Sequence, residues 1–229
     1  MKKRGATLRR IVSCALSICL VLSLSACSGG KNQKAFEASK AAYQNVNAAY
    51  EIVEKMGSDI YEAWRMGIYD DDEIMDEGCA YLAGELSLSE DELAEGVIGA
   101  ISAVVGEGML EEETEQMIRD NPNVLFTVFE DNPFTFCVEV VKQAYIANGK
   151  ADEAGQYLED AKAQMKDMSE NYSDYEHYPA LKGYYTTTSS FYDFCLNPQG
   201  SFEQIKTTIE DYRGEARDYN ADLDYIFEE

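Results

Sequence analysis

Histidine is almost absent from this sequence, because His177 is the only one among the 229 residues. A metal site built on several imidazoles is therefore excluded. We interpret His177 as a polar residue of a turn between two helices, since a lone histidine lacks the orienting partners that a catalytic base needs. The sequence also has no GxSxG, HExxH, Walker A or GxGxxG motif. We predict no catalytic residue, no metal ligand and no cofactor, and we expect that the chain is not an enzyme.

Proline is also rare, with four residues, and the runs without glycine are long, which is typical of a helical protein. Apolar residues recur every three or four positions over residues 32–67, 151–176, 179–195 and 202–226. This spacing places one apolar stripe along each predicted helix, and such stripes pack as nearly antiparallel helices. The stripes at both ends of the chain resemble coiled-coil heptads. We predict an all-α fold, built as a bundle of long helices.

Shorter amphipathic segments fill the middle of the chain, over residues 70–148. Ser89 and Glu92 stand three positions apart at the start of one segment and predict a capping box. The segment Val124–Phe129 has enough aromatic and β-branched residues for a strand. No partner strand is visible, so we predict a short helix there. We expect residues 32–229 to form a single helical domain in which residues 70–148 are a cap of shorter helices on the bundle.

Cysteine is too scarce for a disulfide framework. Of the six cysteines, Cys79, Cys137 and Cys195 belong to the helical domain, and an odd number cannot all pair with one another. Each lies on the apolar side of a predicted helix, so we expect small buried side chains. Whether two of the three pair is left open by the sequence. Their wide spacing excludes a local zinc site.

Only one apolar run approaches the length of a membrane span, and it lies near the N-terminus. Five basic residues precede it, the run extends from Ile11 to about Leu24, and it ends in Leu24-Ser-Ala-Cys27. This order of charge, apolar residues, small residues and cysteine resembles the lipobox signal peptide of bacterial lipoproteins. The resemblance covers residues 1–28. It implies that residues 1–26 are removed and that the Cys27 thiol carries a diacylglyceryl group.

Residues 27–31 would then be the lipidated cysteine and a short flexible tether. Two acyl chains give stable membrane attachment where one does not. We therefore expect the protein at the outer face of the bacterial cytoplasmic membrane, with the membrane as a partner through the lipid on Cys27. The alternatives are an uncleaved anchor helix or an ordinary secretory signal. The run is short for a spanning helix, and an ordinary signal needs no cysteine at this place.

Basic residues are few, with 19 Lys and Arg against 43 Asp and Glu. Five of the basic residues precede Cys27, so 14 remain against 43 acidic ones and the mature chain has a formal charge of −29. Nucleic acid is excluded as a partner, because binding it needs a basic face. Contact with anionic lipid headgroups is disfavoured for the same reason. The charge indicates either a solvated acidic surface or attraction to a basic protein or peptide.

Four consecutive acidic residues, Asp70–Glu73, suggest a cation site. An EF-hand loop needs glycine at its sixth position and a bidentate glutamate at its twelfth. Counted from Asp70, these positions hold Met75 and Tyr81, so the EF-hand is rejected. Acidic residues in the first turn of a helix are the expected arrangement. An irregular, weak cation site is left as the alternative.

Tyrosine is abundant, with 16 residues, of which seven lie between Tyr157 and Tyr192. Several occupy stripe positions, where a buried tyrosine needs a partner for its hydroxyl. We predict a recognition face that includes Tyr172, Tyr175, Tyr184 and Tyr192 as exposed side chains. The alternative is a thin bundle in which these rings are the rim of the core.

The leading functional hypothesis is a membrane-anchored lipoprotein that acts as a protein-interaction or scaffold module. The second hypothesis is a substrate-binding lipoprotein that holds a small molecule or a basic peptide between the bundle and the cap. An envelope hydrolase is the weakest of the three. A flat tyrosine-rich face favours the first hypothesis, and a deep pocket with convergent polar groups favours the second.

Overall fold

The computed structural model describes residues 31–106, 108–129 and 132–227 of the chain. Across these ranges every regular element is a helix, and no strand occurs among them. The predicted all-α fold is therefore confirmed. Residues 1–30, with the predicted signal peptide and Cys27, lie outside the described residues. Among the residues described, no helix combines the length and the apolar character needed to cross a membrane.

Four long helices form the stalk of the molecule: α2 (Lys31–Tyr69), α8 (Lys150–Asn171), α9 (Tyr178–Leu196) and α10 (Phe202–Phe227). They run side by side, and α2 contacts each of the other three. The stripes of apolar residues seen in the sequence are the faces that the four helices turn toward one another. With a rise of 1.5 Å per residue, the 39 residues of α2 span about 58 Å. This helix runs the whole length of the stalk and continues into the cap.

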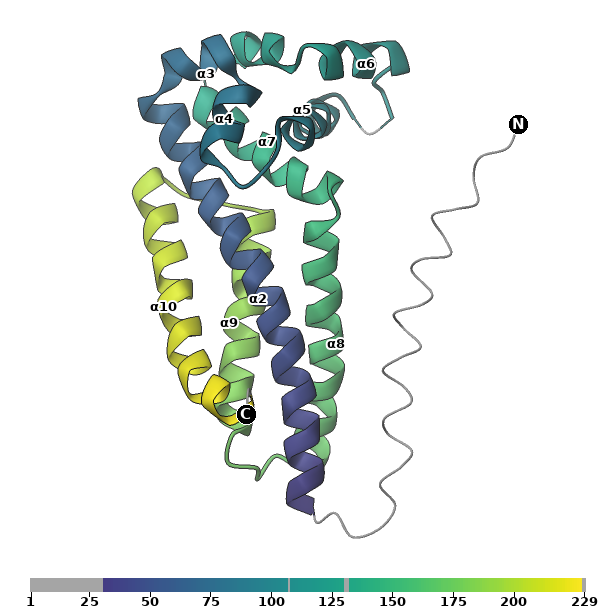
Figure 1. Ribbon diagram of the computed structural model, residues 1–229, viewed down its shortest axis with the longest axis vertical. Coiled ribbons are helices and arrows are strands. Elements are labelled where there is room, and N and C mark those ends of the chain that lie inside the picture. Colours follow the sequence, from purple (N-terminus) through teal and green to yellow (C-terminus); the bar gives the residue numbers. More distant parts are fainter. Residues whose placement is uncertain (1–30, 107, 130–131, 228–229) are drawn as a thin grey trace, which may run out of the picture.

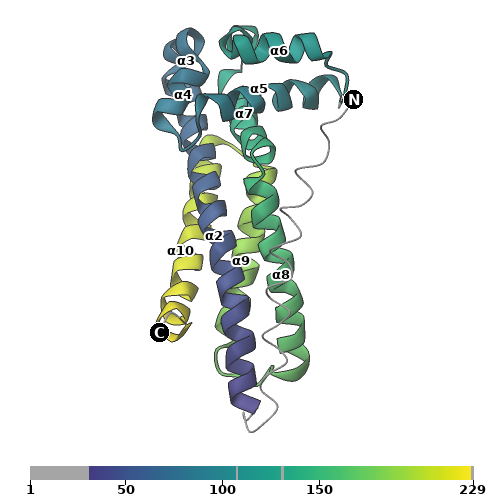
Figure 2. The same ribbon diagram turned by 45° about the vertical axis from the view of Figure 1, so that its right-hand side comes forward.

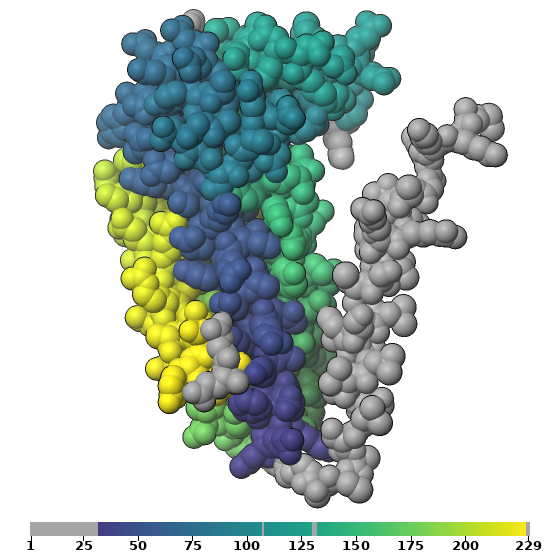
Figure 3. All heavy atoms as spheres, viewed as in Figure 1, coloured from purple at the N-terminus to yellow at the C-terminus, as the bar shows by residue number. Residues whose placement is uncertain are grey.

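The remaining helices gather at the end of α2 that lies away from Lys31, where they form the cap (Figures 1 and 2). Figure 3 shows the cap as a broad head on the narrower stalk. The predicted cap of shorter helices is confirmed. Its elements, in chain order, are α3 (Asp71–Glu77), α4 (Cys79–Glu85), α5 (Glu90–Val105), α6 (Glu112–Asp120), the 3₁₀ helix η1 (Pro122–Phe129) and α7 (Pro133–Ala147).

Two capping boxes fix helix starts, and the sequence predicts the box at Ser89. At α5 the backbone N–H of Glu92 donates to Ser89 Oγ (3.3 Å), and the Ser89 N–H donates to the Glu92 carboxylate (2.9 Å). At α10 the same exchange joins Ser201 and Gln204. Each box satisfies backbone donors that have no partner inside the helix.

The structure refines two further expectations: where the helix α8 ends, and which type of helix the segment Val124–Phe129 forms. The helix predicted over residues 151–176 is too long, because α8 ends at Asn171. The N–H of Tyr172 still donates to the Met168 carbonyl (2.8 Å), but the following residues form two successive turns that reverse the chain before α9. The segment Val124–Phe129 is helical, as predicted, although the helix is of the tighter 3₁₀ type.

Glycine makes the crossing of α5 and α7 possible. A Cβ atom at Gly96 would collide with the Val140 carbonyl oxygen, and one at Gly99 would lie 2.8 Å from Gln143 Cβ. Gly96 and Gly99 therefore allow the close packing of the two helices. The core beneath this crossing is continuous with the upper part of the stalk.

The three cysteines of the helical domain are all buried and free. Burial raises the pKa of the Cys79 and Cys137 thiols to about 12, and it also raises the pKa of Cys195. A thiol with a raised pKa carries little reactive thiolate near neutral pH. The prediction that these residues are small buried side chains is confirmed.

Candidate functional site

Tyr184 does not lie on an exposed face, and the expectation that it does is wrong. Its side chain is completely buried, with its ring 5.7 Å from the ring of Tyr50 and 6.2 Å from that of Tyr43. Its hydroxyl donates to Asn47 Oδ1 at 2.9 Å. The stripe of α9 faces α2 at this position, and the amide of Asn47 supplies the partner that a buried tyrosine hydroxyl needs. Tyr184 is a core residue and cannot contact a partner protein.

The other three predicted tyrosines are half-buried, but they do not form one face. Tyr172 and Tyr175 lie in the turns between α8 and α9, at the end of the stalk away from the cap. Tyr192 lies near the other end of α9. It stands 14 positions after Tyr178, the first residue of that helix, and this spacing corresponds to a distance of about 21 Å along the helix axis. A single recognition face across all four tyrosines is therefore excluded.

Tyr192 instead belongs to an open groove between α8 and α9, which we call the α8–α9 groove. The groove has a volume of about 690 Å³. It lies in the half of the stalk next to the cap, because it uses the first half of α8 and the second half of α9 (Figure 1). Its main lining residues are Asp152, Gln156, Glu159, Lys162, Tyr185, Ser189, Tyr192 and Asp193.

Gly155 shapes the floor of the groove. A Cβ atom at this position would lie 2.8 Å from the Tyr192 hydroxyl oxygen. The missing side chain therefore lets the Tyr192 hydroxyl rest against α8, which fixes one wall of the groove. Tyr185 stands seven residues before Tyr192, so two helical turns separate two tyrosines on nearly the same face of α9.

The charge of the groove is negative. Lys162 pairs with Glu159 at 3.0 Å on the rim, so these two charges offset each other. Asp152 and Asp193 lie on opposite walls, and both raise the pKa of the Tyr192 hydroxyl, although burial of the ring raises it more. Both carboxylates line the same groove as Tyr192. The arrangement offers two acidic groups and two aromatic rings, which suits an ammonium or guanidinium group.

Sequence reasoning found Tyr192 and missed Tyr185, Asp152 and Asp193. The spacing of seven between Tyr185 and Tyr192 was a usable signal. Nothing in the sequence, however, indicated which of 43 acidic residues would face them. That information comes from the pairing of α8 with α9 and from the contact at Gly155.

A second hollow of about 400 Å³ lies between α2 and the end of α10. Two of the polar side chains that line it already have hydrogen-bond partners within the protein. The Tyr43 hydroxyl donates to Asp224 Oδ1 at 3.0 Å, and the Asn47 amide donates to Glu51 Oε1 at 3.3 Å. The ring of Tyr43 also packs against Phe227. These contacts hold α10 against α2, so this hollow has a structural role.

Asp59 is a buried carboxylate at the junction of stalk and cap. It is 4% exposed, and its Oδ2 atom accepts hydrogen bonds from the Tyr145 hydroxyl (2.8 Å) and the Ser87 N–H (3.3 Å). Burial raises its pKa above the ordinary value of an aspartate, and the two hydrogen bonds oppose that effect. The side chain joins α2 to α7 and to the loop before α5. It is out of reach of a ligand and acts as a structural link.

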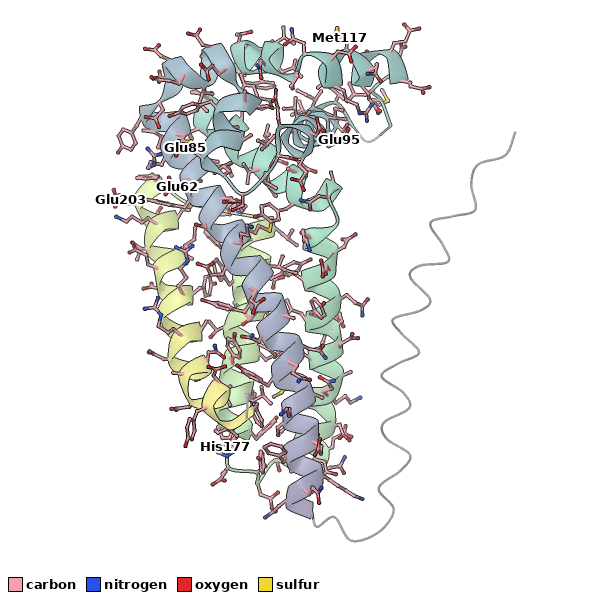
Figure 4. All side chains as sticks on the ribbon, in the orientation of Figure 1. Glu62, Glu85, Glu95, Met117, His177 and Glu203 are labelled. Atoms are coloured by element: carbon pink, nitrogen blue, oxygen red, sulfur yellow. The ribbon has the colours of Figure 1, made fainter. Side chains whose placement is uncertain are left out.

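His177 lies in the turn before α9, as predicted, at the end of the stalk opposite the cap (Figure 4). Its Nε2 atom is 3.2 Å from the Glu176 carboxylate, and its ring meets Tyr175 and Phe227 edge-on. It is therefore far from the α8–α9 groove.

The acidic run Asp70–Glu73 opens α3, with Asp70 at the N-cap position. Asp70 is paired with Arg65 at 3.2 Å, and the next three acidic residues occupy the first helical turn, where the helix dipole favours them. Within the described residues, no three His, Cys, Asp or Glu side chains are grouped to hold a metal ion. The weak cation site stays a prediction without geometric support.

The cap concentrates the negative charge of the protein, which sequence reasoning did not separate from the total. Residues 70–148 contain 20 Asp and Glu against two basic residues, Arg119 and Lys142, a formal charge of −18. Both basic residues are paired inside the cap: Arg119 with Glu95 at 2.6 Å, and Lys142 with Glu139 at 2.6 Å. The cap therefore has no unpaired base of its own to offset its surface charge.

Large apolar side chains are also exposed on the cap. Figure 4 shows Met117 pointing away from the stalk on the outer side of α6. The others are Val104, Val105, Met109, Val124, Val128 and Ile146.

No family model, curated protein or solved structure matches the chain. Three features of the chain itself bear on its function: the α8–α9 groove, the distribution of charge, and the resemblance of residues 1–28 to a lipoprotein signal peptide.

Proposed function

We propose that the chain is a lipoprotein, anchored through Cys27 at the outer face of the bacterial cytoplasmic membrane, that binds basic segments of other proteins. It acts as an interaction module and not as an enzyme. The observation that carries this proposal is the α8–α9 groove, an open channel in which Asp152 on α8 lies opposite Tyr185, Tyr192 and Asp193 on α9.

The chemistry of the groove selects a positively charged side chain. A lysine or arginine inserted beside Tyr192 would meet two carboxylates and the face of an aromatic ring. A cation over an aromatic ring contributes about 0.5–1 kcal/mol at an exposed site. The overall charge of −29 adds long-range attraction, which raises the rate of encounter with a basic partner. An open groove admits a side chain that is still attached to an extended polypeptide, which an enclosed pocket does not.

The geometry of the chain agrees with a membrane anchor at the foot of the stalk. Three residues separate Cys27 from Lys31, where α2 begins, and the other end of this helix, inside the cap, lies about 58 Å further along. The groove and the cap are therefore the parts furthest from the anchoring point (Figure 1). A stalk of this kind presents its binding surfaces away from the lipid headgroups.

A small cationic molecule is the second candidate ligand. The volume of about 690 Å³ is within the range of small-molecule sites, but such sites are mostly apolar and bury most of the ligand. The polar and open groove fits this description less well than it fits a peptide side chain. The third candidate, a hydrolase, gains nothing from the groove, because the single histidine lies at the other end of α9.

Titration calorimetry with a ten-residue peptide of alternating arginine and glycine tests the proposal. We expect the chain from residue 28 onward to bind it, and the double change Asp152→Asn with Asp193→Asn to weaken binding at least tenfold. The matched control is Asp211→Asn with Asp218→Asn, which removes the same charge from exposed positions on α10. Equal affinity of the two double variants would contradict the proposal. Free arginine amide that binds as tightly as the peptide would favour the second candidate.

A further inference from the structure

We propose that the cap has its own docking surface, separate from the α8–α9 groove, and that this surface binds a basic amphipathic helix of a partner protein. The surface consists of the last turn of α5 and the loop that follows it, residues 103–105 and Met109. We call it the cap tip. The inference goes beyond the proposed function, which rests on the groove.

The cap tip is an apolar helix end without a covering layer. The first half of α5 is buried in the core through Leu93 and Val97. Its last turn leaves the core, so that Val104 is 73% exposed and Val105 is 49% exposed. Ala103 between the buried and the exposed parts is also exposed. An apolar stretch that continues past the point where the core ends indicates a contact that the isolated chain does not make.

Met109 extends this apolar surface. It is 72% exposed, and its N–H donates to the Gly106 carbonyl at 3.1 Å, which folds the loop back over the end of α5. A Cβ atom at Gly106 would lie 3.3 Å from Met109 Cγ, so this side chain lies against the helix end. Methionine adapts its shape to different apolar partners, which suits a docking surface.

The cap tip is held in place by the rest of the cap. Arg119 of α6 reaches across to α5 and forms two hydrogen bonds with the Glu95 carboxylate, at 2.6 and 3.2 Å. Ile118 beside it is buried in the core. These contacts fix α6 against the first half of α5, nine residues before Val104, so the cap tip projects from a helix pair that is held together.

The position of the cap tip excludes the membrane as its occupant. Figure 2 shows α5 and α6 projecting sideways beyond α8, and Figure 1 shows both at the opposite end of the stalk from Lys31. Lipid on Cys27, four residues before Lys31, would hold the membrane at the far end. The acidic surface of the cap would in addition be repelled by anionic headgroups.

The charge of the cap selects among the remaining occupants. Glu111, Glu112 and Glu113 follow Met109 after one residue, Leu110, and are all exposed. A second copy of the chain would bring another cap of formal charge −18 against them, which like-charge repulsion opposes. A partner that is apolar on one face and basic beside it satisfies both parts of the surface. A basic amphipathic helix has this pattern, and it is a recurring ligand of exposed methionine-containing surfaces.

The probe for the test is an 18-residue peptide of leucine and lysine whose leucines fall on one helical face. A peptide of the same composition in scrambled order has the same charge but no apolar face. We expect the chain from residue 28 onward to bind the amphipathic peptide. The triple change Val104→Ser, Val105→Ser and Met109→Ser should weaken that binding at least tenfold and leave the scrambled peptide unaffected.

Controls separate this surface from others. Tyr225→Ser removes a large apolar side chain that is 77% exposed on α10 and should leave binding unchanged. Asp152→Asn with Asp193→Asn changes the groove, so it should weaken binding of both lysine-rich peptides alike and leave the preference for the amphipathic over the scrambled peptide in place. That preference belongs to the cap tip alone, so the two proposals fail independently. Glu111→Gln with Glu112→Gln and Glu113→Gln should weaken binding and reduce its salt dependence. An unchanged melting temperature shows that each variant is folded.

Three results would overturn the inference. The first is equal affinity of the triple variant and the unchanged chain for the amphipathic peptide. The second is equal affinity of the unchanged chain for the amphipathic and the scrambled peptide, which would mean that the charge of the peptide alone accounts for its binding. The third is concentration-dependent dimerisation in sedimentation analysis that the triple variant abolishes, which would make a second copy the occupant.

Discussion

The buried carboxylate of Asp59 allows a prediction about the pH dependence of stability. Asp59 links α2 of the stalk to Tyr145 of α7 and to the N–H of Ser87. Burial is the largest influence on its pKa and raises it above the ordinary value of an aspartate. The nearby charge of Lys55 lowers it by less. The folded protein therefore binds a proton at Asp59 more tightly than the unfolded chain does.

The change we consider is Asp59→Asn, which keeps an acceptor for both hydrogen bonds but cannot ionise. In the unchanged protein, the contribution of Asp59 is fully present below its unfolded pKa and is lost as the pH rises through its folded pKa. The asparagine variant has no such loss. The free energy of unfolding of the asparagine variant should therefore increase relative to that of the unchanged protein as the pH rises from about 3.8. Each unit of pKa shift corresponds to about 1.4 kcal/mol.

The assay is urea denaturation of both proteins at several pH values between 3.5 and 7, followed by circular dichroism. Taking the difference between the two proteins removes the contribution of the other carboxylates, which both share. The reasoning is refuted if the asparagine variant loses stability relative to the unchanged protein as the pH rises. Tyr145→Phe is a second check, because it leaves the carboxylate without its hydroxyl donor and should raise the pKa of Asp59 further.

Three further predictions concern the core, the helix crossing and the anchor. Tyr184→Ser should destabilise the protein by roughly 3–5 kcal/mol, as for other large buried residues, whereas Tyr172→Ser at a half-buried turn should cost far less; equal melting temperatures would contradict the assigned burial. Gly96→Val should destabilise by more than about 2 kcal/mol, because its side chain would press on the α7 backbone; a thermal melt like that of the unchanged chain would count against the α5–α7 crossing. Cys27→Ala should abolish labelling with a radioactive fatty acid in growing cells, and undiminished labelling would remove the anchor from the account.

The long helices could be predicted from the sequence because their signal is local. Apolar residues at steps of three and four define α2 and α10 almost to their ends, and the pair Ser201 and Gln204 marks the start of α10. The same local information failed at the end of α8. There the apolar spacing continues through Tyr172 and Tyr175, but the chain turns to reach α9. A stripe of apolar residues does not record whether its last members continue a helix or pack against a turn.

The candidate site was harder to predict than the fold, because it depends on contacts between distant segments. Tyr184 and Tyr192 both belong to α9, yet one bonds to Asn47 of α2 and the other lines the groove with α8. The groove further depends on Gly155, whose missing side chain admits the Tyr192 hydroxyl. The exposure of the cap tip has the same origin, since the sequence after Gly96 reads as continuous core and only the packing shows where the core ends.

The most direct test of the proposed binding role is site-specific crosslinking in living cells. A photoreactive phenylalanine derivative at the position of Tyr192 would report what occupies the α8–α9 groove, and the same derivative at the position of Tyr225 would serve as the control. The account predicts an adduct at Tyr192 that is absent at Tyr225 and maps to a lysine- or arginine-rich segment of another protein. Adducts that are identical at both positions, or that map to segments without basic residues, would contradict it.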